Sequence, residues 1–241
     1  MDEFEGFDTA PGTLVAATLA GQAVQMCLSA ARLHLGDPDE RGRRLATPTP
    51  DDAWLAILAA DALIDALLPL VDSDTATALG QSLGQLLAAF PARYPAYQAR
   101  LPLTLTARMA QHGQAVTPNA PAPAPAPAPN RAPCEPVKVD ELVHQLFQAF
   151  VSVAGHHLGD PLPAGGRLPA PDPEEARLCL TLAGALYAQL FDMLSPGVAE
   201  RWRAELAAML ERFEDAAAPM GAPAASLEAV AAAAWADVEG P

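Results

Sequence analysis

The chain has 241 residues, of which 51% are hydrophobic and only 5% are aromatic, and Ala and Leu supply most of the apolar side chains. Because Ala and Leu favour helices, while the β-branched and aromatic residues that favour strands are scarce, the composition predicts an all-α protein. The formal net charge of −15 repels nucleic-acid backbones and anionic membrane surfaces, so we expect neither as a partner.

The three cysteines, Cys27, Cys134 and Cys179, lie far apart and form no Cys-x-x-Cys pair. No combination of Cys and His has the spacing of a zinc site, so we predict no metal and no other cofactor. Cys27 and Cys179 lie in apolar runs and are expected to be buried, reduced thiols. The N-terminal stretch is acidic where a secretory signal would be basic, which together with the thiols indicates a cytoplasmic protein.

The sequence contains a tandem duplication. Residues 13–90 align without a gap on residues 136–213, at an offset of 123 residues and with 25 identities in 78 positions. This is roughly three times the number that composition alone would produce, so each copy is one structural repeat. We divide the chain into an acidic tail, a first helical repeat, an Ala/Pro-rich linker, a second helical repeat, and a further linker with a short amphipathic helix: residues 1–12, 13–112, 113–136, 137–215 and 216–241.

The first helix of each repeat is predicted over residues 14–35 and 137–158, where apolar residues recur at helical spacing. Residues 14–35 carry a single full charge, Arg32, and are long enough to cross a membrane. The matching stretch contains Asp140 and Glu141, which do not suit a membrane span. We therefore expect neither copy to cross a membrane.

The second helix is predicted over residues 53–71 and 176–194. In both copies it follows a capping residue, a proline at the first helical position and two carboxylates, at residues 49–52 and 172–175. The helix is apolar on nearly every side, which indicates burial by several neighbours.

The third helix is predicted to follow residues 72–73 and 195–196, where the chain offers cap-like side chains. The first copy alone continues into a further apolar stretch, residues 101–109. Because a unit of about 80 residues has a limited core, we expect the two three-helix units to pack together as a pseudo-two-fold six-helix bundle.

The linker between the copies is an alternating Ala-Pro run, which favours polyproline II and spans roughly 60 Å when extended. At the C-terminal end, Leu227 and Val230 begin a short amphipathic stripe with Trp235 beside it. This segment either docks on the protein's own surface or captures a partner through the tryptophan.

The pentapeptide His-Leu-Gly-Asp-Pro occurs twice, at residues 34–38 and 157–161. A histidine beside an aspartate could form a metal or acid–base site. The favoured interpretation is a helix stop, with the histidine at the negative end of the helix dipole, the glycine in a left-handed cap and the proline preventing continuation. His156 precedes His157 in the second copy only, and adjacent helical residues point too far apart to share a metal.

A set of polar residues is identical in both copies of the first helix: Gln22, Gln25 and Ser29 match Gln145, Gln148 and Ser152. They form either an ordinary solvated face or a face where the repeats meet each other or a common partner.

Two further groups of charged residues could carry chemistry. Asp61 and Asp65 lie one helical turn apart, but the second copy has Gly184 and Ala188 there, which weakens the case for a catalytic carboxylate pair. Arg44 matches Arg167 in the loops, where either could cap a helix or contact an anion, although neither loop has a phosphate-binding signature. The sequence therefore predicts no catalytic residue.

The order of motifs is a helix ending in His-Leu-Gly, a loop with Asp-Pro and a glycine, a helix with Ile-Asp, and a helix with Leu-Leu. The carriers are residues 34–38, Gly42, Ile64-Asp65 and Leu86-Leu87 in the first copy, and residues 157–161, Gly165 and Leu210 in the second, where Tyr187-Ala188 replaces Ile-Asp. This order resembles the small bacterial proteins of domain-of-unknown-function family 1844. The family's Thr-Lys-Gly-Asn-Leu turn and Tyr-x-Leu-Arg ending are missing here. The resemblance implies an all-helical fold and no established activity.

From these patterns we expect a non-enzymatic cytoplasmic interaction or scaffold protein that binds a protein partner or itself. The alternative is an enzyme, or a small-molecule or metal sensor, with a pocket between the two helical units.

Overall fold

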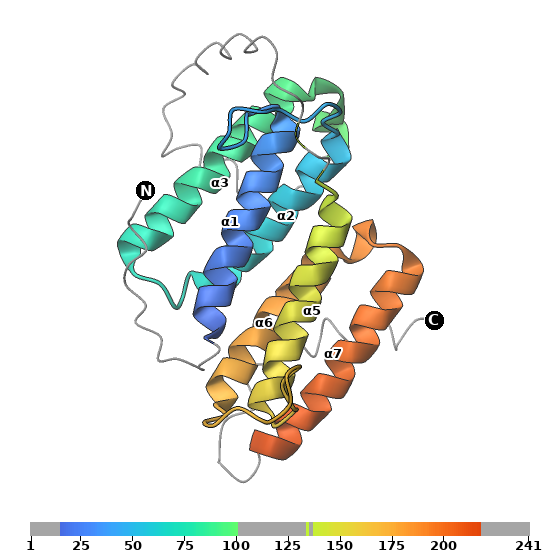
Figure 1. The fold of residues 1–241 in the computed structure, drawn as a ribbon. Coiled ribbons are helices and arrows are strands. Elements are labelled where there is room, and N and C mark those ends of the chain that lie inside the picture. The colour runs from blue at the N-terminus through green and yellow to red at the C-terminus, as the bar shows by residue number, and fades with distance from the viewer. Residues whose placement is uncertain (1–14, 101–133, 135–136, 218–241) are drawn as a thin grey trace. The chain divides into compact units, whose positions relative to one another are not determined.

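A computed structural model describes residues 15–100, 134 and 137–217 (Figure 1). The elements in chain order are α1 (Ala16–Leu35), α2 (Pro50–Leu67), α3 (Ser73–Arg93), the 3-10 helix η1 (Pro95–Arg100), α5 (Val139–His157), α6 (Pro173–Leu190), the 3-10 helix η2 (Phe191–Met193) and α7 (Pro196–Ala217). In this part of the chain the only pairing of extended backbone is an isolated bridge between Leu45 and Cys134. The prediction of an all-α fold is therefore confirmed for the residues that the structure describes.

The first helix of each repeat ends as predicted. Gly36 and Gly159 have φ angles of +97° and +99°, which favour glycine. In α1 the Asp37 N–H donates to the Arg32 carbonyl and the Gly36 N–H to the Leu33 carbonyl, both at 3.0 Å. The same pair of bonds closes α5. This is the Schellman arrangement, which satisfies carbonyls that the helix end leaves without a partner.

The second helices begin as predicted but end earlier. Thr49 and Asp172 cap α2 and α6 with their side chains, and a proline follows each. The predicted ends at residues 71 and 194 are wrong, because these helices end at Leu67 and Leu190. In the first repeat Pro69 has no N–H with which to continue the helical ladder. In the second repeat the chain tightens into η2, where the Leu194 N–H donates to the carbonyl of Phe191.

The central helices are buried on several sides, as their composition predicts. In α2, 12 of the 18 residues are buried, including Trp54, Ile57 and Leu63. The side chains of Cys179, Leu182 and Leu186 are buried in the same way in α6. Among the described residues, each of these two helices supplies more buried apolar residues than any other helix of its repeat.

Close contacts between Cα atoms divide the chain into two compact units. Unit 1 comprises Met1–Ala23 and His144–Pro241, and unit 2 comprises Val24–Val143. The boundaries fall within α1 and α5. Each unit therefore combines helices of one repeat with the opening residues of the first helix of the other repeat.

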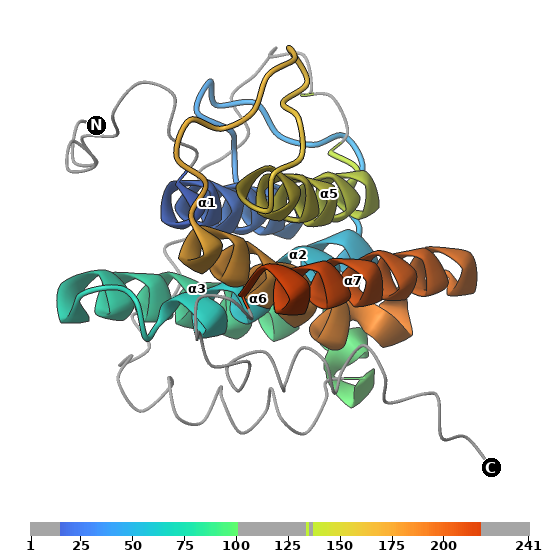
Figure 2. The ribbon, with the colours of Figure 1, turned by 90° about the horizontal axis from the view of Figure 1, so that it is seen from below.

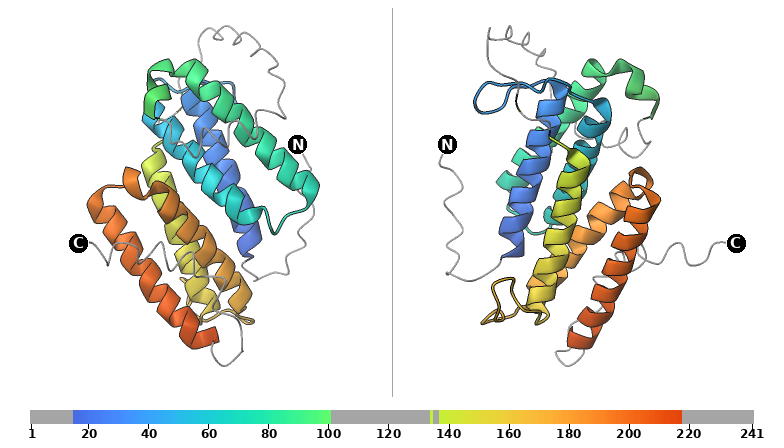
Figure 3. Two further views of the ribbon diagram at one scale, coloured as in Figure 1. Left: turned by 180° about the vertical axis from the view of Figure 1, so that it is seen from behind. Right: turned by 45° about the vertical axis from the view of Figure 1, so that its right-hand side comes forward.

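Unit 1 is built around α6 and α7, which run side by side and are joined through η2 (Figure 3). The Trp202 ring of α7 is fully buried and stacks on Phe147 of α5, with ring centroids 3.9 Å apart and an interplanar angle of 4°. The long loop from α5 to α6 projects on the side of α5 away from α7 (Figure 2). Stacked aromatic rings thus join α7 to the first helix of its repeat.

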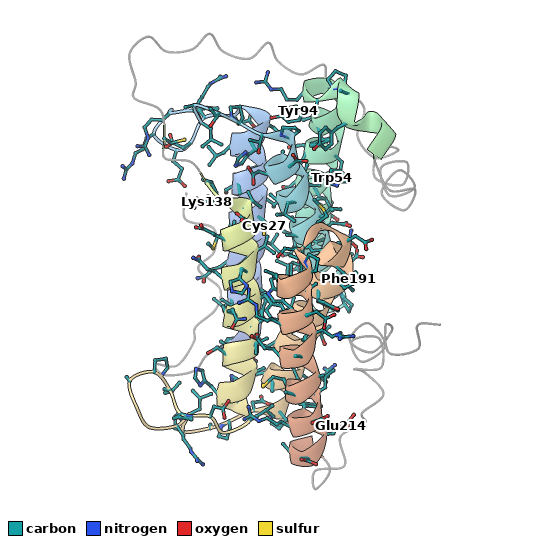
Figure 4. The ribbon with its side chains drawn as sticks, turned by 90° about the vertical axis from the view of Figure 1, so that its right-hand side faces the viewer. Cys27, Trp54, Tyr94, Lys138, Phe191 and Glu214 are labelled. Atoms are coloured by element: carbon teal, nitrogen blue, oxygen red, sulfur yellow. The ribbon has the colours of Figure 1, made fainter. Side chains whose placement is uncertain are left out.

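Unit 2 is built around α2 and α3. The Phe90 ring of α3 lies 5.1 Å from the Trp54 ring and 5.4 Å from the Tyr94 ring, centroid to centroid (Figure 4). The Tyr94 hydroxyl donates a hydrogen bond of 2.5 Å to the carbonyl of His34, at the end of α1. α3 is therefore joined to α2 through Phe90, and the chain after α3 is joined to α1 through Tyr94.

Among the described helices, none is both long enough and apolar enough to cross a membrane. This finding includes α1, whose length and low charge had raised the possibility of a membrane span.

Candidate functional site

The two histidines of the repeated pentapeptide make the same hydrogen bond in both repeats. The His34 Nδ1 accepts the Thr49 N–H at 3.2 Å, and the His157 Nδ1 accepts the Asp172 N–H at 3.1 Å. Thr49 and Asp172 are the capping residues of α2 and α6. Each histidine therefore joins the end of the first helix to the start of the second helix within its repeat.

His34 also bonds to the other repeat. Its Nε2–H donates to the Val137 carbonyl at 2.9 Å, within unit 2. A backbone N–H can only donate and a carbonyl can only accept, so the ring is the neutral tautomer with its proton on Nε2. An Asp52 carboxylate oxygen lies 3.8 Å from Nδ1, a distance that an ion pair with a protonated ring would allow. We assign the neutral form, because the Nδ1 lone pair already accepts the Thr49 N–H.

These bonds agree with the helix-stop interpretation. The buried ring of His34 in addition acts as an acceptor and a donor between backbone groups. A general base needs an available lone pair, and here that lone pair accepts a backbone N–H. Among the described residues, no group of three or more His, Cys, Asp or Glu side chains could hold a metal ion.

The two aspartates of the pentapeptide have different surroundings. Asp160 forms a double hydrogen bond with the Arg212 guanidinium of α7, at 2.6 and 3.0 Å. Asp37 is exposed, and Ala89 stands at the position that matches Arg212. Both side chains of the Asp160–Arg212 pair are roughly two-fifths exposed, so the pair stabilises the fold by at most about 1 kcal/mol.

The matched polar residues of the first helices are mostly exposed. Gln22, Gln25 and Ser29 face solvent on α1, as do Gln145 and Ser152 on α5. The exception is Gln148, which is partly buried and donates a 2.6 Å hydrogen bond to the Glu205 carboxylate of α7. The Ser152 hydroxyl lies at hydrogen-bond distance, 3.3 Å, from the His156 Nε2. In the second repeat, two members of the set therefore make contacts within unit 1.

One part-buried polar contact of the second repeat involves residues that the first repeat lacks. The Trp202 Nε1–H donates to the His144 Nδ1 at 3.0 Å, above the stack with Phe147. The matching residues of the first repeat are Leu79, Gly21 and Val24. The joint appearance of a tryptophan, a histidine and a phenylalanine at these three positions was the available signal, and sequence reasoning did not use it.

The repeats also meet at the start of α1. The Ala16 N–H donates to a Glu175 carboxylate oxygen at 2.5 Å, within unit 1. We had assigned Glu175 to the first turn of its own helix. Its carboxylate also satisfies an N–H that the first turn of α1 leaves without a helical partner.

The three cysteines are free and buried, which confirms the predicted burial of Cys27 and Cys179. Burial raises the pKa of the Cys27 thiol (Figure 4) and of the Cys179 thiol to about 12. The negative charge of the Glu175 carboxylate also raises the pKa of Cys179. A thiol with so high a pKa carries almost no thiolate at neutral pH and is a poor nucleophile or metal ligand. Cys134 donates its backbone N–H to the Arg44 carbonyl at 3.1 Å.

The remaining sequence predictions divide into two groups. Arg167, one of the two matched loop arginines, is exposed. Apart from Cys134, the Ala/Pro-rich linker lies outside the described residues, as do the C-terminal residues Leu227, Val230 and Trp235.

No family model, curated protein or solved structure matches this chain. The resemblance to family 1844 therefore stays a prediction from the motifs.

Proposed function

We propose that this chain is a non-enzymatic cytoplasmic interaction or scaffold protein that presents one helical surface twice. The observation that carries the proposal is a set of identical polar residues that remain exposed in both repeats: Gln22, Gln25 and Ser29, with Gln145 and Ser152. Exposed helix positions contribute little to folding stability. Folding alone therefore does not account for the same amides and hydroxyl at these positions in both copies.

Apolar side chains at other surface positions support the proposal. Met26 lies beside Gln25 and is 48% exposed. The turn between the second and third helices exposes Leu70 by 54% in the first repeat and the matching Met193 by 40% in the second. Apolar side chains at the same surface position of both repeats are suited to contact a partner.

We further propose that the two repeats pack on each other around a pseudo-two-fold axis. Two hydrogen bonds support this arrangement, from Ala16 to Glu175 and from His34 to Val137, because each joins one repeat to the other. Residues 137–217 expressed alone are then expected to self-associate or to fold poorly. Light scattering that shows a folded monomer, stable on dilution, would contradict this packing.

The interaction surface can be tested with a matched pair of variants. Gln22→Arg/Gln25→Arg changes the repeated face. Gln81→Arg/Gln85→Arg changes two exposed glutamines on α3 whose counterparts in the second repeat are alanines. The first variant is expected to lose self-association or a co-purifying protein while its thermal melting is unchanged, and the second should behave as the native chain.

Equal behaviour of the two variants would contradict the assignment of the face. A dose-dependent thermal stabilisation by a metal, nucleotide or metabolite would instead support the alternative of an enzyme or sensor.

A further inference from the structure

The turn between α2 and α3 exposes an apolar patch. Leu68 is 40% exposed and Leu70 is 54% exposed, and Pro69 between them is exposed as well. The N–H groups of both leucines donate to carbonyls at the end of α2, so the backbone of the turn is held in place. Single apolar side chains are common on a surface, but three in succession form a patch that is suited to contact a partner.

Carboxylates follow this patch directly along the chain. Asp72 and Asp74 are both exposed. Residues 45–92, which include all of α2 and nearly all of α3, contain six aspartates and no Lys or Arg. Exposed aspartates are ionised at neutral pH, so the patch has a negative border.

The cations of unit 2 lie at its opposite end. The His34 ring at the end of α1 bonds to Thr49 at the start of α2 and to Val137, and the Tyr94 hydroxyl attaches the end of α3 to the same place. Figure 1 shows the loop between α1 and α2 at this end and the α2–α3 turn at the other. In the described part of unit 2, every Lys and Arg lies in or next to the segments that meet here, namely the arginines within residues 32–44, Arg93, Arg100 and Lys138.

The length of α2 separates these cations from the patch. Its 18 residues span about 27 Å. Charges interact weakly in physiological salt beyond a screening length of roughly 8 Å. The cations at the far end of unit 2 therefore do not neutralise the border of the patch.

The matching turn of the second repeat has a different charge. Met193, which matches Leu70, is 40% exposed, so an apolar side chain is present there too. Neither of the two aspartates has a counterpart, since the matching residues are Ser195 and Gly197. Residues 190–203 instead carry balanced charges: Asp192, Glu200, Arg201 and Arg203. The acidic border therefore belongs to the first repeat alone.

The charges of the chain indicate which kind of occupant suits the patch. A carboxylate border attracts Lys and Arg and repels anionic segments. Residues 1–14 and 218–241 contain no Lys or Arg, residues 101–133 contain only two, and a second copy of the chain carries the same net charge of −15. The complementary occupant is therefore a segment of another protein that combines apolar side chains with lysine or arginine.

We propose that the α2–α3 turn of the first repeat docks a cationic, apolar segment of a protein partner. Leu68 and Leu70 contact apolar side chains of that segment, and the negative charges of Asp72 and Asp74 attract its lysines or arginines. This inference rests on the proposed interaction function and specifies the chemistry of the partner. It concerns residues other than the repeated polar face.

A synthetic peptide tests the proposal on the full-length chain. The probe is a labelled amphipathic helix of leucine and lysine, of about 18 residues or five helical turns, and fluorescence anisotropy measures its binding. The native chain is expected to bind it at least about tenfold more tightly than a peptide in which glutamate replaces each lysine. Equal affinity for the two peptides would overturn the proposal.

A matched pair of variants separates the patch from the net charge of the chain. Leu70→Ser/Asp74→Asn removes one apolar side chain and one carboxylate from the patch, and should weaken binding of the leucine–lysine peptide about tenfold. Met193→Ser/Asp192→Asn makes the same two kinds of change at the matching turn of the second repeat, and should leave the affinity unchanged. Equal weakening by the two variants would show that binding follows net charge, and would overturn the site.

Two control measurements complete the test. If circular dichroism shows that the first double variant does not fold, Leu70→Ser alone decides, and unchanged peptide affinity in that variant would overturn the site. Light scattering identifies a different occupant: a native dimer that becomes monomeric in the Leu70→Ser/Asp74→Asn variant would show that a second copy covers the patch, against the proposal. If the native chain does not bind the peptide but Gln22→Arg/Gln25→Arg still loses its partner, this site is refuted while the proposed interaction function stands.

Discussion

Replacement of His34 by alanine is expected to lower the free energy of unfolding by about 3 to 6 kcal/mol. Two backbone groups lose their partner, the Thr49 N–H and the Val137 carbonyl. A fully buried group left without a hydrogen bond costs about 1–3 kcal/mol, and because both bonds are part-buried the lower end of that range applies to each. The ring is 3% exposed, so its removal also leaves a cavity.

Two conservative variants separate the bonds that His34 makes. Asparagine places an acceptor oxygen near the position of Nδ1, so His34→Asn should retain the bond within the repeat and lose the bond to Val137. Glutamine places its amide nitrogen near the position of Nε2, so His34→Gln should retain the bond between repeats and lose the bond to Thr49. Each variant is expected to recover about half of the loss seen with alanine.

Urea denaturation followed by far-ultraviolet circular dichroism measures these differences. Gln25→Ala, at an exposed position of the same helix, is the control and should change stability by less than about 0.5 kcal/mol. A cost below about 1 kcal/mol for His34→Ala would refute the assignment of two part-buried hydrogen bonds to this ring.

Three further predictions follow from local geometry and pKa. Gly36→Ala should cost about 1–2 kcal/mol because of the positive φ angle, whereas Gly21→Ala in the same helix, where a Cβ has open space, should be neutral or stabilising in the same denaturation assay. With pKa values of about 12, the thiols of Cys27 and Cys179 should react with a maleimide at least about 100-fold more slowly in the folded chain than in urea at mildly alkaline pH, and comparable rates would show that the thiols are accessible. The backbone N–H and hydroxyl of Thr75 hold the pKa of the Asp72 carboxyl below its usual value, so its stabilising effect is present at neutral pH and lost as pH falls through the lowered pKa. Asp72→Asn should therefore flatten the acid side of the stability profile, and an unchanged profile would contradict the cap.

The elements themselves could be predicted from the sequence because their causes are local. Thr49 and Pro50 start α2, and Gly36 ends α1, through bonds and backbone angles that involve residues a few positions apart. The burial of α2 followed from the absence of a polar face. The offset of 123 residues then indicated that both repeats use the same signals.

The ends of the second helices and the partners of the polar residues depended on the folded chain. The pattern of apolar residues continues past Leu67, but Pro69 ends the hydrogen-bond ladder before the apolar run stops. The sequence identifies the histidine as part of a helix end, but it does not show which backbone groups the ring will bond, because those groups are brought together only by folding.

The contacts between repeats were decided by the tertiary structure alone. Glu175 bonds to Ala16 across 159 residues, and His34 bonds to Val137 across 103. Periodicity shows which face of a helix is apolar, but it does not specify which distant backbone group will lie opposite a given side chain. The sequence by itself therefore determined the helices, their caps and the duplication, whereas the folded chain decided which polar groups of one repeat complete the hydrogen bonding of the other.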